Sequence, residues 1–260
     1  MLIREHPSPN FDLRGGHDIR LIVLHYTGMR TARAALERLC DRAARVSAHY
    51  MIDEQGRILR LVRDEHRAWH AGHSHWRGED DVNAISLGIE LVNGGHDFGL
   101  PPYPDAQMES LLHLLDHLCH RFGIDRREIV GHSDVAFARK QDPGEKFDWE
   151  LLAGNGFGLW PATPLPPAAE EEPLAPGSEG EAVRALQRQL AAFGYGLHDD
   201  GYYGPLTQAA VAAFQRHFNQ QNVTGRADPD TRARLDWLVR DREAPKAAAA
   251  RHDPQPDDAA

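Results

Sequence analysis

The sequence has little cysteine, no long apolar run and no excess of positive charge, and each shortage excludes a class of protein. Its 260 residues include two cysteines, Cys40 and Cys119, which are too few for a disulfide framework. No stretch approaches the length of a transmembrane helix, and the start MLIREHPSPNFD lacks the apolar core of a signal peptide. The net charge of −10 argues against nucleic acid, which binds to a basic stripe.

These shortages predict where the protein works and with which partners. We expect a monomer that binds neither nucleic acid nor a membrane. The missing export signal predicts a cytoplasmic location, although a trimmed or misassigned start would remove the same signal from a periplasmic protein. At 260 residues the chain is long enough for one or two domains with cores of their own.

Two separate stretches supply the residue types of a metal site. His25 ends the apolar run in RLIVLHYTG, and His132 and Asp142 lie in VGHSDVAFARKQDPG. The second stretch reads as a strand end followed by a loop, in which Pro143 keeps Asp142 out of helical geometry. Any two ligands would be weak evidence in a chain with 16 histidines. Two imidazoles and a carboxylate together suit Zn²⁺ in a site that keeps one position open for water.

A resemblance to a known family rests on segments that occur in the family's order. They are LIVLHYTG (21–28), VSAHYMID (46–53), AWHAG (68–72), NAISLGIELVN (83–93), VGHSDVA (130–136) and ARKQDPG (138–144). The chain resembles the zinc-dependent N-acetylmuramoyl-L-alanine amidases of the AmpD and AmiD type, which are relatives of peptidoglycan recognition proteins. The resemblance implies Zn²⁺ as cofactor, held by His25, His132 and Asp142, and muropeptides or peptidoglycan as the partner. It implies hydrolysis of the amide bond between N-acetylmuramic acid, or its 1,6-anhydro form, and L-alanine.

Two more residues take catalytic roles through this resemblance. The segment ISLGIELV alternates, with its large apolar residues from Ile85 to Leu91 on one face and Glu90 on the other. From the residues alone, Glu90 would be a solvated carboxylate. The resemblance makes it the base that takes a proton from water and delivers it to the leaving amine. Lys140, close to Asp142, would donate a hydrogen bond to the developing oxyanion.

Four residues are candidates for binding the substrate. Trp69 and His70, in AWHAG, would line the groove that receives the glycan or the peptide. His49 is either a site-lining residue or a packed, hydrogen-bonded structural histidine, and the resemblance favours the site. Asn83 matches an asparagine of the family. Asp81 stands where several members carry an arginine, so the recognition of the stem peptide stays open.

Residue periodicity predicts an α/β fold for residues 1–158, the zinc amidase domain, with a mixed central sheet flanked by helices. RLIVLHYT, ISLGIELV and EIVGHSD read as strands, and VSAHYMID with RILRLV reads as a hairpin that turns at residues 54–56. Residues 31–44 and 104–122 and the segment FDWELLAG read as helices. Residues 64–81 read as a long loop, of a kind that is often functional.

The composition changes after this domain. Residues 159–177, rich in proline and glutamate, predict a semi-stiff linker. Apolar spacing in residues 178–241 predicts three short helices, the first opened by a capping box of Ser178 and Glu181. This small domain resembles the peptidoglycan-binding domain found beside many cell-wall hydrolases. Residues 242–260 predict a disordered tail.

Two other functions stay open at this point. A non-catalytic peptidoglycan receptor would keep the fold but lose a metal ligand, and this chain retains all three. A zinc peptidase that cuts within the stem peptide would use the same zinc, base and oxyanion donor, so only the products distinguish it from an amidase. The missing export signal favours recycling of anhydro-muropeptides, whereas a wall-binding domain favours intact or fragmented peptidoglycan.

Overall fold

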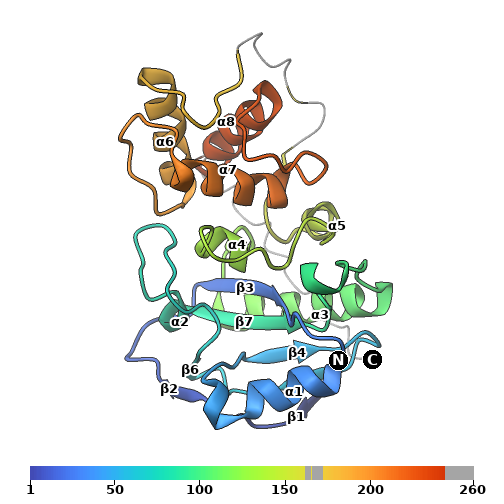
Figure 1. Ribbon diagram of the computed structural model, residues 1–260. Coiled ribbons are helices and arrows are strands. Elements are labelled where there is room, and N and C mark those ends of the chain that lie inside the picture. Colours follow the sequence, from blue (N-terminus) through green and yellow to red (C-terminus); the bar gives the residue numbers. More distant parts are fainter. Residues whose placement is uncertain (162–164, 166–171, 244–260) are drawn as a thin grey trace, which may run out of the picture.

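The protein, described here by a computed structural model over residues 1–161, 165 and 172–243, is built around a six-stranded mixed sheet (Figure 1). The strands lie in the order β1 (Ile3–Glu5), β5 (Ile58–Arg60), β4 (Tyr50–Ile52), β7 (Ser86–Leu91), β3 (Leu21–Tyr26) and β8 (Ile129–Gly131). Neighbouring strands are parallel except in the β4–β5 hairpin. This pairing confirms the predicted fold class and the predicted hairpin.

Helices cover both faces of the sheet. They are α1 (Ala32–Cys40), α2 (Val82–Ile85), α3 (Asp105–Phe122), α4 (His132–Val135) and α5 (Trp149–Gly154), with 3-10 turns at Arg42–Ala44 and His96–Phe98. On one face, the apolar stripe of α3 places Leu111 and Leu115 against Ile22 and Ile89 in a buried cluster. The 104–122 prediction is confirmed to within one residue.

The opposite face of the sheet carries the ionisable residues. Strand alternation turns Ile22 toward α3, and it turns Val23 and His25 the other way. Glu90 lies beside His25 because β3 and β7 pair in parallel with these two residues in register. A candidate ligand and the candidate base therefore project from adjacent strands of one sheet.

Several local predictions differ from the structure. The predicted strand EIVGHSD ends at Gly131, because α4 begins at His132. Ile85 does not begin the strand, because the side chain of Asp81 caps the short helix α2, which ends at Ile85. The loop predicted over residues 64–81 includes β6 (His66–Ala68), which pairs with β2 (Phe11–Leu13). These two strands are too short to show a hydrophobic period in the sequence.

The C-terminal part contains the three predicted helices, α6 (Glu181–Phe193), α7 (Pro205–Phe218) and α8 (Pro229–Glu243). The predicted capping box is wrong, because Ser178 accepts a hydrogen bond from the N–H of Ala175 and the N-cap of α6 is Gly180. No helix in the described ranges is long and apolar enough to cross a membrane. Residues 162–164 and 166–171 of the predicted linker, and 244–260 of the predicted tail, lie outside the described residues. The domain boundaries remain a prediction.

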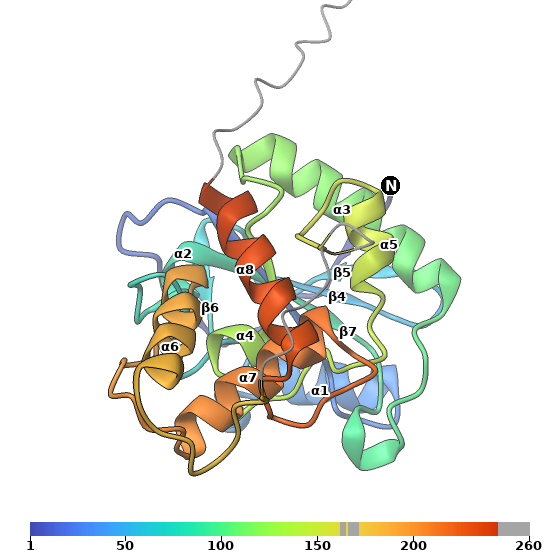
Figure 2. The ribbon, with the colours of Figure 1, turned by 90° about the horizontal axis from the view of Figure 1, so that it is seen from above.

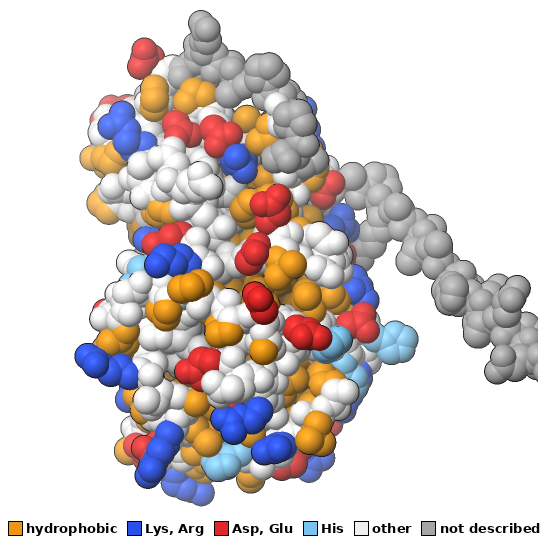
Figure 3. Space-filling model, turned by 90° about the vertical axis from the view of Figure 1, so that its right-hand side faces the viewer, with side chains coloured by type: hydrophobic (Ala, Val, Ile, Leu, Met, Phe, Trp, Pro, Cys, Tyr) orange, Lys and Arg blue, Asp and Glu red, His pale blue; other side chains and the backbone are white. Residues whose placement is uncertain are grey.

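The C-terminal helices pack directly on the part that carries the sheet, with α7 lying against α4 and α8 packed on α6 (Figure 2). One buried cluster runs from Val23 and Val130 in the sheet through Val135 in α4 to Phe193 and Phe214 in α6 and α7. The space-filling view shows hydrophobic, acidic and basic side chains interspersed over one face of the molecule (Figure 3). Because the contact is apolar and continuous, the two parts form one body.

Candidate active site

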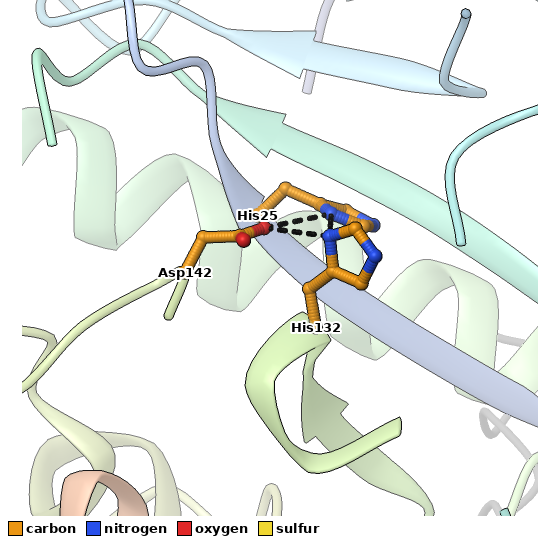
Figure 4. Close-up of side chains that lie close together, drawn as sticks. All are labelled: His25, His132 and Asp142. Carbon is orange, nitrogen blue, oxygen red and sulfur yellow. Dashed lines mark hydrogen bonds and ion pairs between the residues drawn. The ribbon is translucent and has the colours of Figure 1, made fainter. Parts of the chain in front are cut away.

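Three side chains of ligand type converge at the carboxyl ends of β3 and β8 (Figure 4). His25 comes from the end of β3, His132 opens α4 directly after β8, and Asp142 follows in the next loop. The Nδ1 atoms of His25 and His132 are 2.9 Å apart, and they lie 3.0 and 2.9 Å from Oδ2 of Asp142. All three residues are buried. This cluster could hold a metal ion.

The chain between His132 and Asp142 doubles back so that the two side chains meet. Gly131 leaves room for this return, because a Cβ at that position would lie 2.8 Å from Cδ of Pro143. The N–H of Ser133 donates to the carbonyl of Asp142 at 2.8 Å, which ties the loop to the first turn of α4. Backbone contacts of the protein therefore close the ten-residue gap between the two candidate ligands.

The tautomer of His132 leaves its Nδ1 free to bind a cation. Its Nε2 lies 3.2 Å from the carbonyl oxygen of Ala71, which can only accept, so Nε2 carries the proton. In the neutral ring Nδ1 then carries a lone pair, and that lone pair points toward Asp142. A hydrogen bond on the far nitrogen is the usual way in which proteins orient a metal-binding histidine.

A chain of hydrogen bonds sets the tautomer of His25 in the same way. The hydroxyl of Ser86 donates to the carbonyl of Val82 at 2.6 Å, so its oxygen accepts from Nε2 of His70 at 3.2 Å. Nδ1 of His70 then accepts from Nε2 of His25 at 3.1 Å, which leaves Nδ1 of His25 with a lone pair. Two nitrogen lone pairs and a carboxylate oxygen meet without a proton between them, and this donor set fits a cation.

Burial and neighbouring charge set the ionisation of the cluster. Burial, reinforced by His132, lowers the pKa of His25 to about 4, so the ring is neutral at pH 7. Burial alone would raise the pKa of Asp142, but the charge and hydrogen bonds of His132 and His25 in their protonated forms outweigh it and hold that pKa well below its usual range. A bound cation would take the place of those protons. A neutral imidazole and an ionised carboxylate are the forms that bind a metal.

Glu90 lies beside this cluster with one carboxyl oxygen unsatisfied. Its Oε2 is buried and has no hydrogen-bond partner within the described part of the chain. Burial raises the pKa of Glu90 well above its ordinary value, the charge of Asp142 adds to the rise, and Lys140 opposes it. A carboxyl group with a raised pKa is suited to exchange protons with a water molecule at neutral pH.

A pocket of about 260 Å³ opens over these residues. The three candidate ligands line it together with Glu90 and Lys140, and Trp69 and His70 line it from the AWHAG loop. Sequence reasoning missed Arg38 of α1, which lines the same pocket. Arg38 lies on the exposed face of an amphipathic helix, where nothing in the sequence signals a neighbouring pocket.

His49 and Asn83, which were expected to bind substrate, are buried and are not among the residues that line this pocket. The side chain of His49 is fully buried, its Nδ1 accepts the N–H of Gly88 at 3.0 Å, and its Nε2 lies 3.1 Å from the carbonyl of His66. Oδ1 of Asn83 accepts the backbone N–H groups of two consecutive loop residues, the first of them His70. Both side chains therefore support the strands and the loop around the pocket, and their direct contact with substrate stays a prediction.

Because His49 is buried and neutral, acid should destabilise the protein through it. Burial, together with the charge of Arg14, lowers the pKa of His49 from 6.5 to about 3. The unfolded chain therefore binds a proton near pH 6.5 that the folded protein binds only near pH 3. Between these values the free energy of unfolding should fall by up to about 1.4 kcal/mol for each pH unit of acidification.

Urea unfolding at several pH values, on the parent protein and on His49→Asn, measures this contribution. Asparagine keeps an acceptor for the N–H of Gly88 but does not titrate. The variant should be less stable at pH 7 and lose less stability on acidification. Identical pH slopes for the two proteins would contradict the prediction.

Comparison with known proteins identifies the family of both parts. Residues 15–145 match the family described as N-acetylmuramoyl-L-alanine amidase, and residues 179–235 match the one described as putative peptidoglycan binding domain. The chain is 34% identical over 239 residues to the N-acetylmuramoyl-L-alanine amidase AmiD of Escherichia coli K12, which covers 85% of this chain and 82% of AmiD. It is 35% identical over 166 residues to the 1,6-anhydro-N-acetylmuramyl-L-alanine amidase AmpD of Haemophilus influenzae, which covers 56% of this chain and 88% of AmpD.

Solved structures agree with the sequence comparison. The fold matches E. coli AmiD in complex with anhydro-N-acetylmuramic acid-L-Ala-D-gamma-Glu-L-Lys, with a TM-score of 0.74 and 31% identity over 91% of this chain and 93% of AmiD. It also matches AmpDh3 of Pseudomonas aeruginosa, with a TM-score of 0.67 and 31% identity over 92% of this chain and 96% of that protein. The resemblance seen in the sequence is confirmed, and the chain belongs to the N-acetylmuramoyl-L-alanine amidase family.

Proposed function

We propose that this chain hydrolyses the amide bond between N-acetylmuramic acid and L-alanine in muropeptides, with Zn²⁺ held by His25, His132 and Asp142. The observation that carries the proposal is the convergence of two imidazole nitrogens and a carboxylate oxygen, 2.9 to 3.0 Å apart, beside the buried carboxyl group of Glu90. Two imidazoles and one carboxylate leave a position open on a tetrahedral ion, as in hydrolytic zinc sites. Membership of the amidase family supports the choice of bond.

Each residue of the pocket has a defined task in this reaction. Zinc in the site would supply a Lewis acid and lower the pKa of water toward neutrality. Glu90 takes a proton from the attacking water and delivers it to the leaving amine of L-alanine. The ammonium group of Lys140 donates a hydrogen bond to the oxygen of the scissile carbonyl as negative charge develops there. Trp69 offers a ring face to the sugar. His70 orients the ring of His25 through the hydrogen bond between its Nδ1 and Nε2 of His25.

The substrate class follows from relatives and from the charge of the pocket. E. coli AmiD and P. aeruginosa AmpDh3 have each been solved with an anhydromuramic peptide. We propose muropeptides, including the 1,6-anhydro form, for this chain as well. Its pocket is lined by the cations Arg38 and Lys140, which complement the carboxylates of a stem peptide.

Mass spectrometry of the products from defined muropeptides, intact and 1,6-anhydro, tests the proposal. We expect a free stem peptide headed by L-alanine, formed in the presence of zinc and absent in the presence of a chelator. Cleavage within the stem would identify a peptidase, and binding without cleavage would identify a receptor. A preference for the anhydro form would favour recycling, and a preference for intact chains would favour wall remodelling.

Replacing Lys140 by methionine should lower kcat by roughly 10²- to 10³-fold, the loss typical of one oxyanion donor. Zinc content should not change, because Lys140 is not among the proposed ligands. Steady-state hydrolysis and metal analysis measure both quantities. Lys146→Met, which changes an exposed lysine of the same loop, is the matched control. An unchanged kcat in the Lys140 variant would remove this residue from the mechanism.

Replacing Gly88 by alanine should weaken zinc binding although Gly88 is not a ligand. The added Cβ would lie 2.4 Å from Cγ of His70, so that ring would have to leave its place between His25 and Ser86. Loss of such an outer-shell partner lowers metal affinity by about 10- to 100-fold. Competition with a chelator measures the change. Gly154→Ala, whose Cβ meets nothing within 4 Å, is the control, and equal affinities would show that His70 does not orient His25.

A further inference from the structure

A buried carboxylate, Asp134, connects the C-terminal helices to the metal-site loop. Its side chain is fully buried, and its Oδ1 accepts the hydroxyl hydrogen of Tyr195 at 2.9 Å. Its Oδ2 accepts the Nδ1–H of His217 and the backbone N–H of Gly131, both at 2.8 Å. A buried charge is stable only when hydrogen-bond partners surround it. The two side-chain partners of Asp134 both come from the C-terminal part.

Aromatic rings of the N-terminal part hold these two partners in place. The ring of His217 stacks on Trp149 of α5, with ring centres 3.7 Å apart and an angle of 21° between the planes. The ring of Tyr195 meets Trp76 edge to face, with centres 5.6 Å apart. Such packing removes the rotational freedom of both side chains. The two donors are therefore aimed at Asp134 before any ligand binds.

Backbone contacts elsewhere keep the two parts from sliding. The N–H of Arg77 donates to the carbonyl of Gly194 at 3.0 Å, next to Tyr195 in the sequence. Nε2 of Gln220 donates to the carbonyl of Phe147 at 2.6 Å, beyond the end of α7. These bonds join the same two parts that share the apolar cluster. The position of Tyr195 and His217 relative to the sheet is therefore set at several points.

A shift of Asp134 would reach the metal site directly. Asp134 belongs to α4, which begins at His132 and has four residues. A single helical turn gains little stability from its own hydrogen bonds, so its surroundings must hold it. The N–H of Ser133, in the same turn, holds the carbonyl of Asp142. Two of the three candidate ligands therefore move with α4.

We propose that Tyr195 and His217 are positioning residues of the metal site, which hold Asp134 and thereby fix α4 with the ligands His132 and Asp142. The C-terminal part is then a structural component of the catalytic centre, whatever its affinity for the wall polymer. The inference rests on the proposed function in one respect, that the three ligands bind zinc. A domain joined only by a linker would behave differently, because changing its side chains would leave zinc affinity unaltered.

Zinc affinity of the full-length protein, measured by competition with a chromophoric chelator, tests the inference. Tyr195→Phe and His217→Phe each remove one donor and keep an aromatic ring. We expect each change to lower zinc affinity by about 10-fold, and both together by up to about 100-fold, as for other outer-shell partners. Tyr202→Phe and His198→Phe change exposed side chains of the same part and should bind zinc as the parent does.

A rescue variant and a folding control separate positioning from loss of structure. His217→Asn places an amide donor close to the position of Nδ1 and should recover much of the zinc affinity lost in His217→Phe. Circular dichroism and cooperative unfolding establish that each variant is folded. If His217→Phe does not fold, Tyr195→Phe decides, since it loses a single oxygen atom. Unchanged zinc affinity in Tyr195→Phe would overturn the inference alone, whereas a parent protein that binds no zinc would overturn the proposed function and the inference with it.

Discussion

Replacing Glu90 by glutamine is expected to lower kcat by roughly 10²- to 10⁴-fold while zinc stays bound. Glutamine keeps the size of the side chain but cannot take a proton from water. Glu90 is not one of the proposed ligands, and it projects from the strand next to the one that carries His25. The metal site should therefore survive the change. Steady-state kinetics with metal analysis of the same sample measures both effects.

The pH dependence of this variant adds a second readout. Burial and the charge of Asp142 raise the pKa of Glu90. In the parent, the rate should therefore rise with pH as this carboxyl group ionises, and the rise should occur at a higher pH than for an ordinary glutamate. The Glu90→Gln variant should lose this rise. Glu109→Gln, on the exposed face of α3, is the matched control and should keep it. Full activity of the Glu90 variant would show that another group takes the proton.

Replacing Asp142 by asparagine should remove zinc and, with it, activity. Asp142 supplies the negative charge of the cluster, and its strongly lowered pKa reflects how closely His132 and His25 surround that charge. An amide oxygen keeps the shape but carries no charge. Zinc affinity should fall by more than the roughly 100-fold that marks loss of an outer-shell partner. Chelator competition and activity at equimolar zinc measure the result.

Excess zinc distinguishes weak binding from a damaged fold in this variant. Partial recovery of activity at high zinc would show that the remaining ligands still assemble. Asp116→Asn, on the exposed side of α3, controls for the loss of a carboxylate elsewhere and should behave as the parent does. Undiminished activity of Asp142→Asn at equimolar zinc would contradict the assignment of this ligand.

Sequence was sufficient where a local pattern and a chemical requirement coincide. The end of an apolar run placed His25 at the edge of a buried strand, and alternation along the next strand turned Glu90 away from the core. The structure brings both residues to one pocket with His132, Asp142 and Lys140. Their roles in binding zinc and in catalysis stay predictions that the variants above test.

The sequence was insufficient where the role of a residue depends on how deeply its side chain is buried or on contacts between residues far apart in the chain. A motif marks the position of His49 but does not say that Arg14 and the strands bury it. The support of His25 by His70 depends on Gly88, because the ring fills the space that a side chain there would take. The contact of Tyr195 with Asp134 joins residues 61 positions apart, and no local sequence pattern around either residue predicts this contact.

The parallel register of β3 and β7 has a consequence for redesign of this enzyme. Residue by residue, Leu21 faces Ser86 and His25 faces Glu90, so the distance between a ligand and the base is set by the hydrogen-bond ladder. Deleting one residue within β7 would turn the carboxyl group into the apolar layer under α3 and bring a hydrocarbon side chain into the pocket. The lengths of the loops around the pocket can therefore be varied in redesign, but the number of residues in β7 has to stay fixed if Glu90 is to remain beside His25.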